Sequence, residues 1–578
     1  MWSTPLLAQR FQVHYGNAST SDQGLHGVKQ LSTGGYVAVG ESFTGGPDAV
    51  VIRTDITGAQ VWANTYQIGT ASHATDVVED VPTGNLIVCG YATDPCGNST
   101  DDIFIMRLKG ATGTILNLQV YDGSRGDDQA WKIIETQFGG GGTNPGDFVV
   151  AGFEASPSNP LSRNGILLRV DATLTQIWMH SYGNAQNNYF YGVDEVTAAP
   201  GIGDLVAAGG SNARSGSTTD IFVVRASGIN GSIGLPPQNM SWTDLGGSNG
   251  NDEARSVRSL GNNAQFPGYT VVAGFTDGVP GINSEEACVV MLKADPCLFG
   301  SAVYFGDGGP RSDRAMDLVE YPPNGNVMVT GYTSAPNFGG RDVFLQDINT
   351  GAMTLGAGAV YGGSADDEGW SVGYAGNSIL PETPGFIVNG ITKSIVPDPG
   401  QIYLIKTDAT LDSKCNWTAW NAPNGQVSGQ TTCGQMADLA IGRQCGPSCG
   451  VTPQPTTWGT GICYGPQAHD RGGNGNDGVS GVDAPAVITF TEGNVSSYPN
   501  PVPSGTPLNI RFDLHANASA DVSVADIVGR VIAQQSIEAS SGSTLHVMNT
   551  DGWPAGAYLV RVTIGGRSST TRIVVTGR

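Results

Sequence analysis

The sequence has few charged residues and no long hydrophobic run. Charged side chains make up 14% of its 578 residues, against about 25% in typical soluble proteins. No apolar stretch reaches the length of about 18 residues that a membrane-spanning helix needs, so we expect no transmembrane segment. Basic residues are scarce, since 28 Lys and Arg against 51 Asp and Glu give a net charge of −23. Such a chain repels a phosphate backbone, which argues against nucleic acid as a partner.

Catalytic motifs are also absent. None of the seven histidines belongs to a Ser or Cys nucleophile motif, and the sequence contains neither His-Glu-x-x-His nor a phosphate-binding loop. The Ser-x-Asp-x-Gly-x-Thr-Trp box of sialidases is missing too. These absences favour a non-catalytic protein. A glycosidase built from carboxylates of separate repeats stays open, because spacing in the sequence does not exclude it.

Glycine, in contrast, is abundant, with 84 residues. Glycine adopts the positive φ that tight turns require, so a glycine-rich chain with few charges is typical of an all-β protein. Hydrophobic residues still make up 39% of the chain, enough for a large core. The chain is also longer than one ordinary domain, which predicts at least two folded regions.

An internal repeat dominates the first 420 residues. One apolar run ends in glycine seven times, and the intervals between these glycines are 50, 62, 57, 65, 57 and 59 residues. Two further apolar runs follow each glycine and one precedes it, which predicts four short strands per unit. The seven repeat glycines are Gly40, Gly90, Gly152, Gly209, Gly274, Gly331 and Gly390.

The repeat predicts an all-β fold in which residues 10–420 form a seven-bladed β-propeller of four-stranded blades. Radial stacking buries both faces of each unit and leaves only short edges. The extra strand at residues 10–16 is expected to complete the last blade and close the propeller. The segment 415–420 is the competing candidate for that place, and a linear β-solenoid is the alternative fold.

Polar residues recur before the strand that precedes each glycine. Aligned on that strand, one position holds only Asp, Asn or Ser, namely Asp22, Ser72, Asp127, Asn187, Asn251, Ser312 and Asp366. We interpret this position as a turn in which the side chain accepts a backbone hydrogen bond. The next position holds four carboxylates, Asp128, Asp252, Asp313 and Asp367. Four carboxylates at one level of a ring are candidate Ca²⁺ ligands, and solvated loop acids are the alternative interpretation.

The nine cysteines indicate an exported protein with disulfides. Two local pairs are expected, Cys89 with Cys96 and Cys288 with Cys297. Five more cysteines follow the repeats, namely Cys415, Cys433, Cys445, Cys449 and Cys463, and we expect the last four to form disulfides. Their spacing lacks the paired Cys-x-x-Cys of zinc sites, which makes zinc the weaker interpretation. The odd total leaves one thiol free or paired with another chain.

The remaining sequence divides into two parts. Residues 421–494 are rich in Gly, Pro, Asn and Cys, which predicts an extension followed by a flexible linker. Residues 495–578 contain six short alternating strands, which predict a small immunoglobulin-like β-sandwich. At the other end, residues 1–9 are too short for a signal peptide and look like the last part of one.

The last part carries a specific resemblance. Its matching residues are the Tyr498-Pro499-Asn500-Pro501 opening, Asp526 and Gly529 around one turn, Gly556 and Tyr558 before a strand, and the terminal strand 571–575. In this order and spacing they resemble the C-terminal sorting domain of type IX secretion cargo from Bacteroidetes and their relatives. The resemblance implies export, contact with the type IX secretion machinery, and a location outside the cell or on the outer membrane. In that family the tail is commonly removed, and the cargo is released or linked to surface lipopolysaccharide.

Three functions follow from these features. The first is a secreted or surface protein that binds a glycan or protein ligand through loops on a rigid scaffold, without catalysis. The second is a self-associating structural subunit of a surface layer or filament. The third is a secreted polysaccharide hydrolase or lyase. No cofactor is required by any motif, and Ca²⁺ is the one ion that the sequence suggests.

Overall fold

A computed structural model of the chain describes residues 10–455 and 496–576 with short gaps, the longest of which are 139–145, 377–383 and 446–453. The chain divides into two compact units, residues 1–469 and 470–578. We call the described part of the first unit the repeat region and that of the second unit the tail. Every regular element in these residues is a β-strand, as expected for an all-β chain. No described segment is a helix that could cross a membrane.

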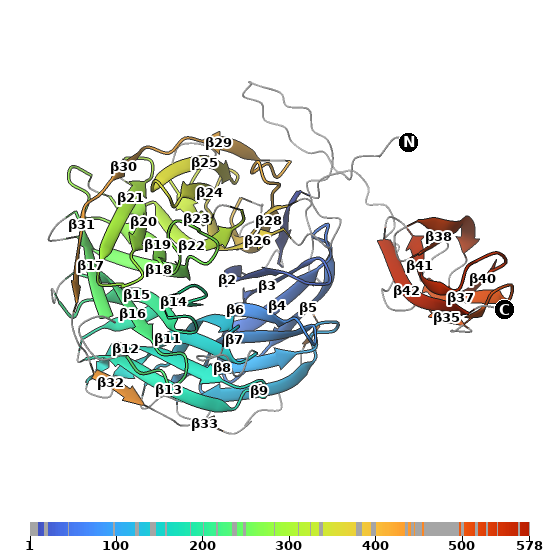
Figure 1. Cartoon of the computed structure of the whole chain (residues 1–578), viewed down its shortest axis with the longest axis horizontal. Helices are drawn as coiled ribbons and strands as arrows, with labels where there is room; N and C mark the ends of the chain where they lie inside the picture. The colour runs from blue at the N-terminus through green and yellow to red at the C-terminus, as the bar shows by residue number, and fades with distance from the viewer. Residues whose placement is uncertain are drawn as a thin grey trace. The chain divides into compact units, whose positions relative to one another are not determined.

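The repeat region consists of seven antiparallel sheets that follow one another around a common centre (Figure 1). Sheet 1 contains β2 (Asp22–Gln30), β3 (Tyr36–Ser42), β4 (Asp48–Thr54) and β5 (Gln60–Tyr66). Sheet 2 contains β6 (Ala71–Asp80), β7 (Asn85–Thr93), β8 (Asp101–Leu108) and β9 (Ile115–Tyr121). Sheet 3 contains β10 (Gln129–Glu135), β11 (Phe148–Ser156), β12 (Asn159–Val170) and β13 (Gln176–Gly183). In each sheet the first of these strands is innermost and the second ends near a repeat glycine.

The other four sheets repeat this order. Sheet 4 contains β14 (Asn188–Glu195), β15 (Leu205–Ser211), β16 (Asp220–Ala226) and β17 (Met240–Leu245), and sheet 5 contains β18 (Asp252–Ser259), β19 (Thr270–Thr276), β20 (Glu286–Leu292) and β21 (Phe299–Phe305). Sheet 6 contains β22 (Arg314–Tyr321), β23 (Asn326–Thr333), β24 (Asp342–Asn349) and β25 (Thr354–Tyr361). Sheet 7 contains β26 (Asp367–Ala375), β27 (Gly385–Thr392), β28 (Gln401–Lys406) and β1 (Phe11–Tyr15). Sheet 7 therefore takes its fourth strand from the N-terminal segment.

The strand β1 pairs with β28 along its whole length, from Phe11 opposite Lys406 to Tyr15 opposite Ile402. This pairing confirms the prediction that residues 10–16 complete the last sheet. The competing segment forms β29 (Trp417–Trp420), which instead pairs with β25 at the outer edge of sheet 6. Packing supports the same arrangement, because Phe11, Val13 and Tyr15 share one buried apolar cluster with residues of β2, β3 and β4 in sheet 1.

The seven repeat glycines all face a β-bulge in the innermost strand. In sheet 5, for example, the register between β18 and β19 shifts between Ala254 and Ser256, directly beside Gly274. The bulge turns the carbonyl group of Glu253 toward Gly274, and a Cβ there would lie 1.8 Å from the carbonyl oxygen. The other six glycines meet the equivalent carbonyl oxygen at 1.9 Å. Glycine recurs at this position because a side chain has no room beside the bulge.

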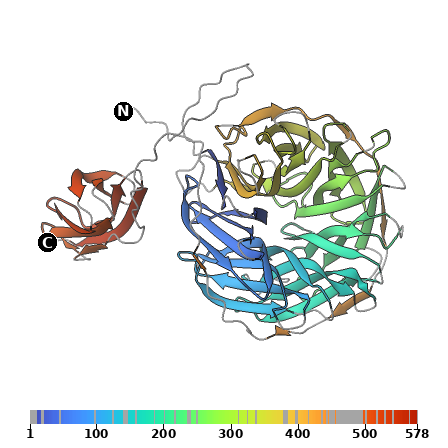
Figure 2. The same cartoon turned by 180° about the vertical axis from the view of Figure 1, so that it is seen from behind.

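The first part of the segment after the repeats is not the extension and linker that the sequence predicts, because it forms short strands. Within residues 417–455, the described strands add a fifth, outer strand to sheets 6, 5, 4, 3, 2 and 1 in turn (Figure 2). These strands are β29, β30 (Asn424–Gln426), β31 (Gly429–Cys433), β32 (Ala437–Ala440), β33 (Gln444–Cys445) and β34 (Gln454–Pro455). We call residues 417–455 the belt. The rest of the expected linker lies outside the described residues.

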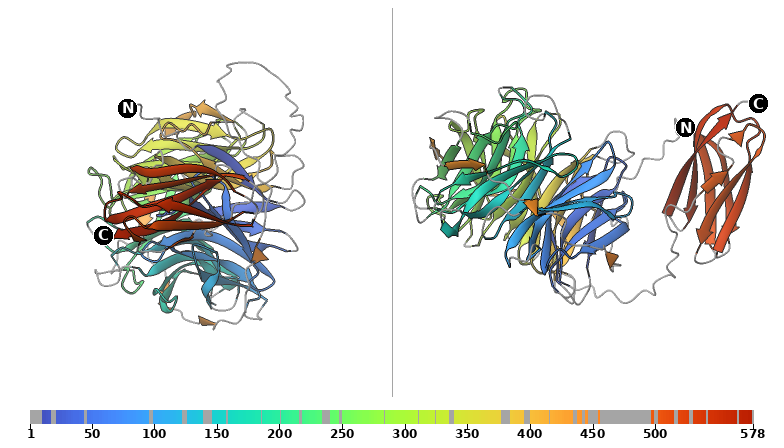
Figure 3. Two further views of the ribbon diagram at one scale, coloured as in Figure 1. Left: turned by 90° about the vertical axis from the view of Figure 1, so that its right-hand side faces the viewer. Right: turned by 90° about the horizontal axis from the view of Figure 1, so that it is seen from below.

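The tail is built from two sheets around one apolar core (Figure 3). Their strands are β35 (Ser496–Tyr498), β37 (Pro507–Leu514) and β40 (Gly542–Asn549) in one sheet, and β36 (Val502–Pro503), β42 (Arg567–Thr576), β41 (Gly556–Ile564), β38 (Ala518–Asp526) and β39 (Val531–Ala539) in the other. All six strands expected from alternating residues are present. The core includes Val522, Val560, Trp553 and Ile573.

The two local cysteine pairs predicted from the sequence are wrong. Cys89 and Cys288 are free and fully buried, in the interior of β7 and β20 respectively. Their side chains pack into the apolar layers between neighbouring sheets, where they act as small hydrophobic groups. Cys297 does form a disulfide, so its partner is a cysteine other than Cys288 or Cys89.

Candidate functional site

The innermost strands of all seven sheets surround a pocket of about 530 Å³. It lies toward the C-terminal ends of these strands, where Lys29, Lys132 and Arg258 come from β2, β10 and β18. Acidic side chains from β6, β10 and β14 line it as well, among them Glu79 and Asp194. Its volume is in the range of pockets that hold small ligands, which occupy about 300–1,000 Å³.

Most acidic groups of the pocket are held by backbone N–H groups of a neighbouring sheet. Glu79 accepts hydrogen bonds from the backbone N–H and the hydroxyl of Ser32, at 2.6 and 2.7 Å. Asp194 accepts one from the N–H of Ser259 at 2.8 Å. Glu195 accepts one from the N–H of Gln137 at 2.5 Å. These contacts join sheet 1 to 2, sheet 4 to 5 and sheet 3 to 4, and they occupy the carboxylate oxygens.

Lys132 lies at the base of the pocket between two buried carboxylates. Its ammonium nitrogen is 3.5 Å from Asp76 of sheet 2 and 3.6 Å from Asp317 of sheet 6. Asp317 also accepts a hydrogen bond from the hydroxyl of Ser256 at 2.6 Å and from that of Ser371 at 3.1 Å. Although burial alone would raise it, the pKa of Asp317 is lowered by nearby Lys132 and Arg258, so this carboxylate is ionised.

Aromatic side chains from four sheets meet at the level of the bulges, next to this charged layer. The His26 ring contacts Trp131 and Trp370 edge-on, with ring centroids 5.5 and 5.3 Å apart. Tyr191 contacts Trp131 at 5.2 Å, and the Arg255 guanidinium lies 4.3 Å above the Tyr191 ring. Burial lowers the pKa of His26 to about 3, so its imidazole is neutral. These rings fill the centre between the innermost strands at that level.

The four predicted metal ligands are fully buried at the starts of innermost strands. They lie in four different sheets, and each accepts a hydrogen bond from a backbone N–H, which belongs to a strand in two cases and to a loop in the other two. For Asp128, Asp252, Asp313 and Asp367, the donors are the N–H groups of Ala155, Leu245, Ser334 and Gly363. Of these four, only Asp313 belongs to an acidic group of the described residues that is compact enough to share one ion.

The sequence alignment of the repeats placed Asp22 and Ser72 one position before the four predicted metal ligands, and this was off by one residue in the first two units. Counted from the repeat glycines, Asp22 and Ser72 are the structural equivalents of Asp128 and Asp252. The bulge in β2 is longer than the others, since the pairing resumes only at Val28, and this shifts the first unit. In the second unit, the correct anchor residue is Val77 rather than Val78.

The preceding position keeps its predicted role in a modified form. Asp127, Asn187, Asn251 and Asp366 accept backbone hydrogen bonds, but the donors lie in or just before the third strand of the preceding sheet rather than in the same turn. The donors are the N–H groups of Asp101, Arg163, Thr219 and Arg341, at 3.0–3.2 Å. These side chains therefore join neighbouring sheets.

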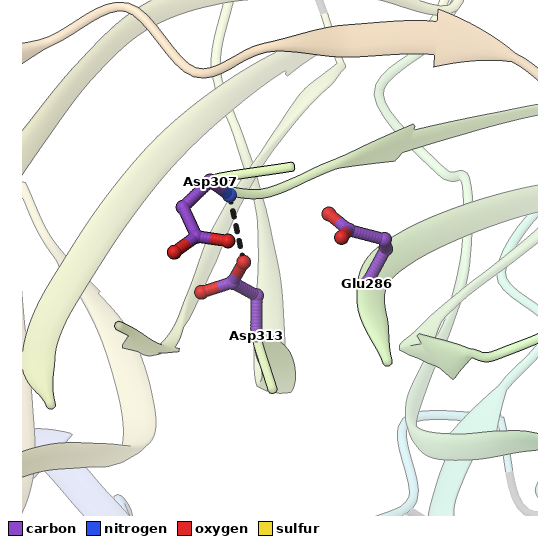
Figure 4. Close-up of side chains that lie close together, drawn as sticks. All are labelled: Glu286, Asp307 and Asp313. Atoms are coloured by element: carbon purple, nitrogen blue, oxygen red, sulfur yellow. Dashed lines mark hydrogen bonds between the residues drawn. The ribbon is translucent and has the colours of Figure 1, made fainter. Parts of the chain in front are cut away.

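The compact acidic group consists of Glu286, Asp307 and Asp313, whose carboxylate oxygens lie within 4.8 Å of one another (Figure 4). Glu286 begins β20, whereas Asp307 and Asp313 flank the loop that leads to β22. Gly306 leaves the space between them open, because a Cβ there would lie 1.9 Å from Glu286 and 2.4 Å from Asp313. Asp313 accepts a hydrogen bond from the N–H of Asp307 at 2.7 Å.

Burial raises the pKa of Glu286 to about 7 and that of Asp313 to about 6. The charge of Asp307 acts in the same direction on both carboxyl groups, because like charges disfavour ionisation. Three carboxylates supply hard oxygen ligands of the kind that Ca²⁺ prefers, although that ion takes six to eight. The residues therefore fit part of a calcium shell, and binding of calcium stays a prediction.

The sorting-domain residues fall within the two-sheet tail. Tyr558 is buried in the core, its ring lies 5.6 Å from that of Trp553, and its hydroxyl donates to the carbonyl group of Pro554 at 2.7 Å. Tyr498 ends β35, Asp526 ends β38 and Gly556 begins β41. The remaining predicted motif residues lie outside the described set, namely Pro499, Asn500, Pro501 and Gly529.

Sequence reasoning missed the basic residues of the pocket, although a signal for them was present. Lys29, Lys132 and Arg258 each adjoin one of the apolar residues on which the repeats were aligned, namely Val28, Ile133 and Val257. Because these anchors lie on the innermost strands, charged residues beside them are expected to come close to the centre.

Comparisons with known proteins identify one part of the chain. Residues 496–576 match the family model described as "Secretion system C-terminal sorting domain". No curated protein matches the chain. Among solved structures, a match is the "Crystal structure of tetra-tandem repeat in extending region of large adhesion protein", at 12% identity and a TM-score of 0.13, covering 99% of this chain and 93% of the other. The tail is thus a type IX sorting signal that engages the secretion machinery and directs the chain to the outside of the cell or its surface.

Proposed function

We propose that the repeat region is a seven-bladed β-propeller whose ring is closed by β1. Support comes from seven apolar clusters, one at each junction between successive sheets, including the junction of sheet 7 with sheet 1. At that last junction the Tyr15 hydroxyl donates to the carbonyl group of Gly58, as Tyr66 does to Gly113 between sheets 1 and 2. Arg10, just before β1, pairs with Asp408 of sheet 7 at 3.1 Å.

We further propose that this propeller is a non-catalytic binding protein of the bacterial surface or the secreted fraction, in a relative of the Bacteroidetes. The observation that carries the proposal is the polar pocket at the centre of the sheets, joined in one chain to a sorting domain. In the pocket, most carboxylates accept hydrogen bonds from backbone N–H groups, and Lys29 and Arg258 form no salt bridge among the described residues. A rigid sheet scaffold around a polar pocket is suited to holding a ligand without a conformational change.

Binding through the pocket is tested by filling it. Val319 lines the pocket and is half-buried, so Val319→Trp places a large side chain there. The purified secreted protein is applied to an array of surface polysaccharides and proteins, and Val319→Trp is expected to lose the signals of the wild type. Val61→Trp, on the outer strand β5 and 37% exposed, is the control that keeps them. Equal signals from the wild type and Val319→Trp would place binding elsewhere.

Export is tested separately, in cells. A chain that ends at residue 495 lacks the sorting domain, so we expect it to stay in the periplasm while the full chain reaches the surface or the medium. Cell fractionation followed by mass spectrometry measures both. Equal amounts of the two chains outside the cell would contradict the role of the tail.

A further inference from the structure

The pocket contains two basic side chains that form no salt bridge within the described part of the chain, although carboxylates lie near both. Among the described residues, no carboxylate lies within salt-bridge distance of the Lys29 ammonium or the Arg258 guanidinium; the one hydrogen bond found for Arg258 goes to the carbonyl group of Val257, at 2.8 Å. This differs from Lys132, which lies between two carboxylates. Arg258 is half-buried and Lys29 is exposed to the water of the pocket, so both cations have hydrogen-bond donors that a ligand can take up.

The two cations influence each other. Desolvation by the surrounding protein lowers the pKa of Lys29 even though water reaches its side chain inside the pocket, and the positive charge of Arg258 lowers it further. The nearby carboxylates of Asp76 and Asp194 oppose this shift, and the backbone N–H groups of Ile133 and Ser259 hold them in place. A negative group that bridges the two cations would remove their mutual repulsion.

Neighbouring sheets hold the acidic side chains of the pocket in fixed positions. Glu79 and Glu195 accept hydrogen bonds from neighbouring sheets, as described above. Glu135 is half-buried, and burial raises its pKa, as does the charge of Asp80. The free donors of the pocket therefore belong to Lys29 and Arg258, and the ligand that fits them is rich in acceptors.

We infer that the central pocket binds the anionic group of a small ligand, a carboxylate, sulfate or phosphate, between Lys29 and Arg258. This inference rests on the proposed binding function and names the ligand chemistry of the same pocket. Arg258 supplies a planar pair of donors that matches the two oxygens of a carboxylate or sulfate, while Lys29 supplies a point charge. A pocket of about 530 Å³ has room for such a group on a sugar-sized molecule.

The test is isothermal titration calorimetry on the full chain with four probes, namely glucuronate, sodium sulfate, inorganic phosphate and uncharged glucose. We expect at least one of the three anions to bind and glucose to bind more weakly. Removing either charge, in Lys29→Gln or Arg258→Gln, is expected to weaken that binding by about tenfold or more, because a charge-assisted hydrogen bond is lost. Lys29→Arg keeps the charge and is expected to keep the affinity.

Two controls separate this inference from a loss of folding and from the proposed function. Lys293→Gln removes an exposed lysine outside the pocket and should leave anion binding unchanged, and thermal unfolding of each variant shows whether it folds. If no anion binds, or if Arg258→Gln binds it like the wild type, the inference is wrong. If glucose binds as well as glucuronate and Val319→Trp removes both, the pocket binds a neutral ligand, so the proposed function holds and the inference falls.

Discussion

At the scale of the residue, the seven repeat glycines are the most regular feature of the repeat. Each of the seven stands beside a bulge whose carbonyl oxygen would meet a Cβ at 1.8 to 1.9 Å. The obstacle is backbone rather than a side-chain end, so a rotamer change does not relieve it. The bulge in turn presents residues such as Trp131 and Arg255 to the centre. The glycines thus determine the shape of the innermost strand as well as the pairing beside it.

Gly274→Ala is therefore expected to destabilise the repeat region by more than about 3 kcal/mol, or to prevent folding, because β18 and β19 must separate to admit the methyl group. The free energy of unfolding is measured by urea denaturation followed by circular dichroism. The matched control is Gly351→Ala, where the nearest contacts of a new Cβ are the side-chain oxygens of Asn349 and Gln265, at 3.2 and 3.4 Å. Equal stability of the two variants would show that the bulge yields easily.

The acidic group of Figure 4 predicts an unusual pH dependence. The pKa of Glu286 is about 7 in the folded protein, against an ordinary value of 4.5. Between these values the folded state binds more protons than the unfolded state, so its contribution to stability falls as the pH rises through this window. Glu286→Gln removes the titration and should raise the melting temperature at pH 8, with little change at pH 4.5. Thermal unfolding in EDTA at both pH values measures this.

Glu285, the residue before Glu286, is a control for which the opposite change in melting temperature is expected. Its pKa is lowered against the effect of burial by its hydrogen bond and ion pair with Arg314, at 2.6 Å, so Glu285→Gln should lower the melting temperature at pH 8. Calcium adds an independent test of the predicted metal ligands. If Glu286, Asp307 and Asp313 hold Ca²⁺, the ion raises the melting temperature of the wild type but not of Glu286→Gln. An unchanged wild type in calcium rejects the ion at this group.

At the scale of the element, a tyrosine at the end of the fourth strand links one sheet to the next. The hydroxyl groups of five such tyrosines donate to a carbonyl group in the turn that follows the third strand of the next sheet. They are Tyr15, Tyr66, Tyr121, Tyr182 and Tyr361. All five are fully buried. Tyr15 lies in β1, so its hydrogen bond crosses from the last sheet to the first and reports directly on ring closure.

Tyr15→Phe and Tyr66→Phe form a matched pair for this contact. Each removes one buried hydroxyl and leaves a carbonyl group without its donor, of Gly58 or Gly113, so each should cost about 1–3 kcal/mol of unfolding free energy. Equal losses are expected if β1 is an integral fourth strand. A full loss for Tyr66→Phe with none for Tyr15→Phe would show that the junction between sheets 7 and 1 opens. Urea denaturation of both variants decides between these outcomes.

The elements differ in how well the sequence predicts them. The four strands per repeat, the place of β1 and the strands of the tail follow from apolar periodicity, because their side chains must fill a core. The belt does not, since strands such as β30 and β33 are two or three residues long and pair with the outer edges through their backbones. Pairing through backbone groups does not constrain the side chains, so no hydrophobic pattern in the sequence marks these strands. The pocket was missed for a different reason, since its basic residues adjoin the apolar anchors but line one pocket only because strands distant in the sequence converge.

At the scale of the whole molecule, the chain joins two units with separate cores. The apolar cluster of the tail, with Val522, Val560 and Ile573, contains no residue of the repeat region. None of the seven clusters of the repeat region contains a residue of the tail. Two cores without shared residues are expected to unfold independently. Such independence suits an export signal, because the machinery can act on the tail while the cargo keeps its own structure.

Calorimetry tests this independence with one substitution in each unit. Trp553→Ala removes a buried side chain from the tail core, so it should lower the free energy of unfolding of the tail by about 3–5 kcal/mol. The melting temperature of the repeat region should stay unchanged. Gly274→Ala should do the reverse. Cleavage at a protease site introduced between residues 470 and 495 should then release a repeat region that melts at the temperature it has in the full chain. If Trp553→Ala also shifts the transition of the repeat region, the units are coupled, and removal of the tail after export would change the stability of the cargo.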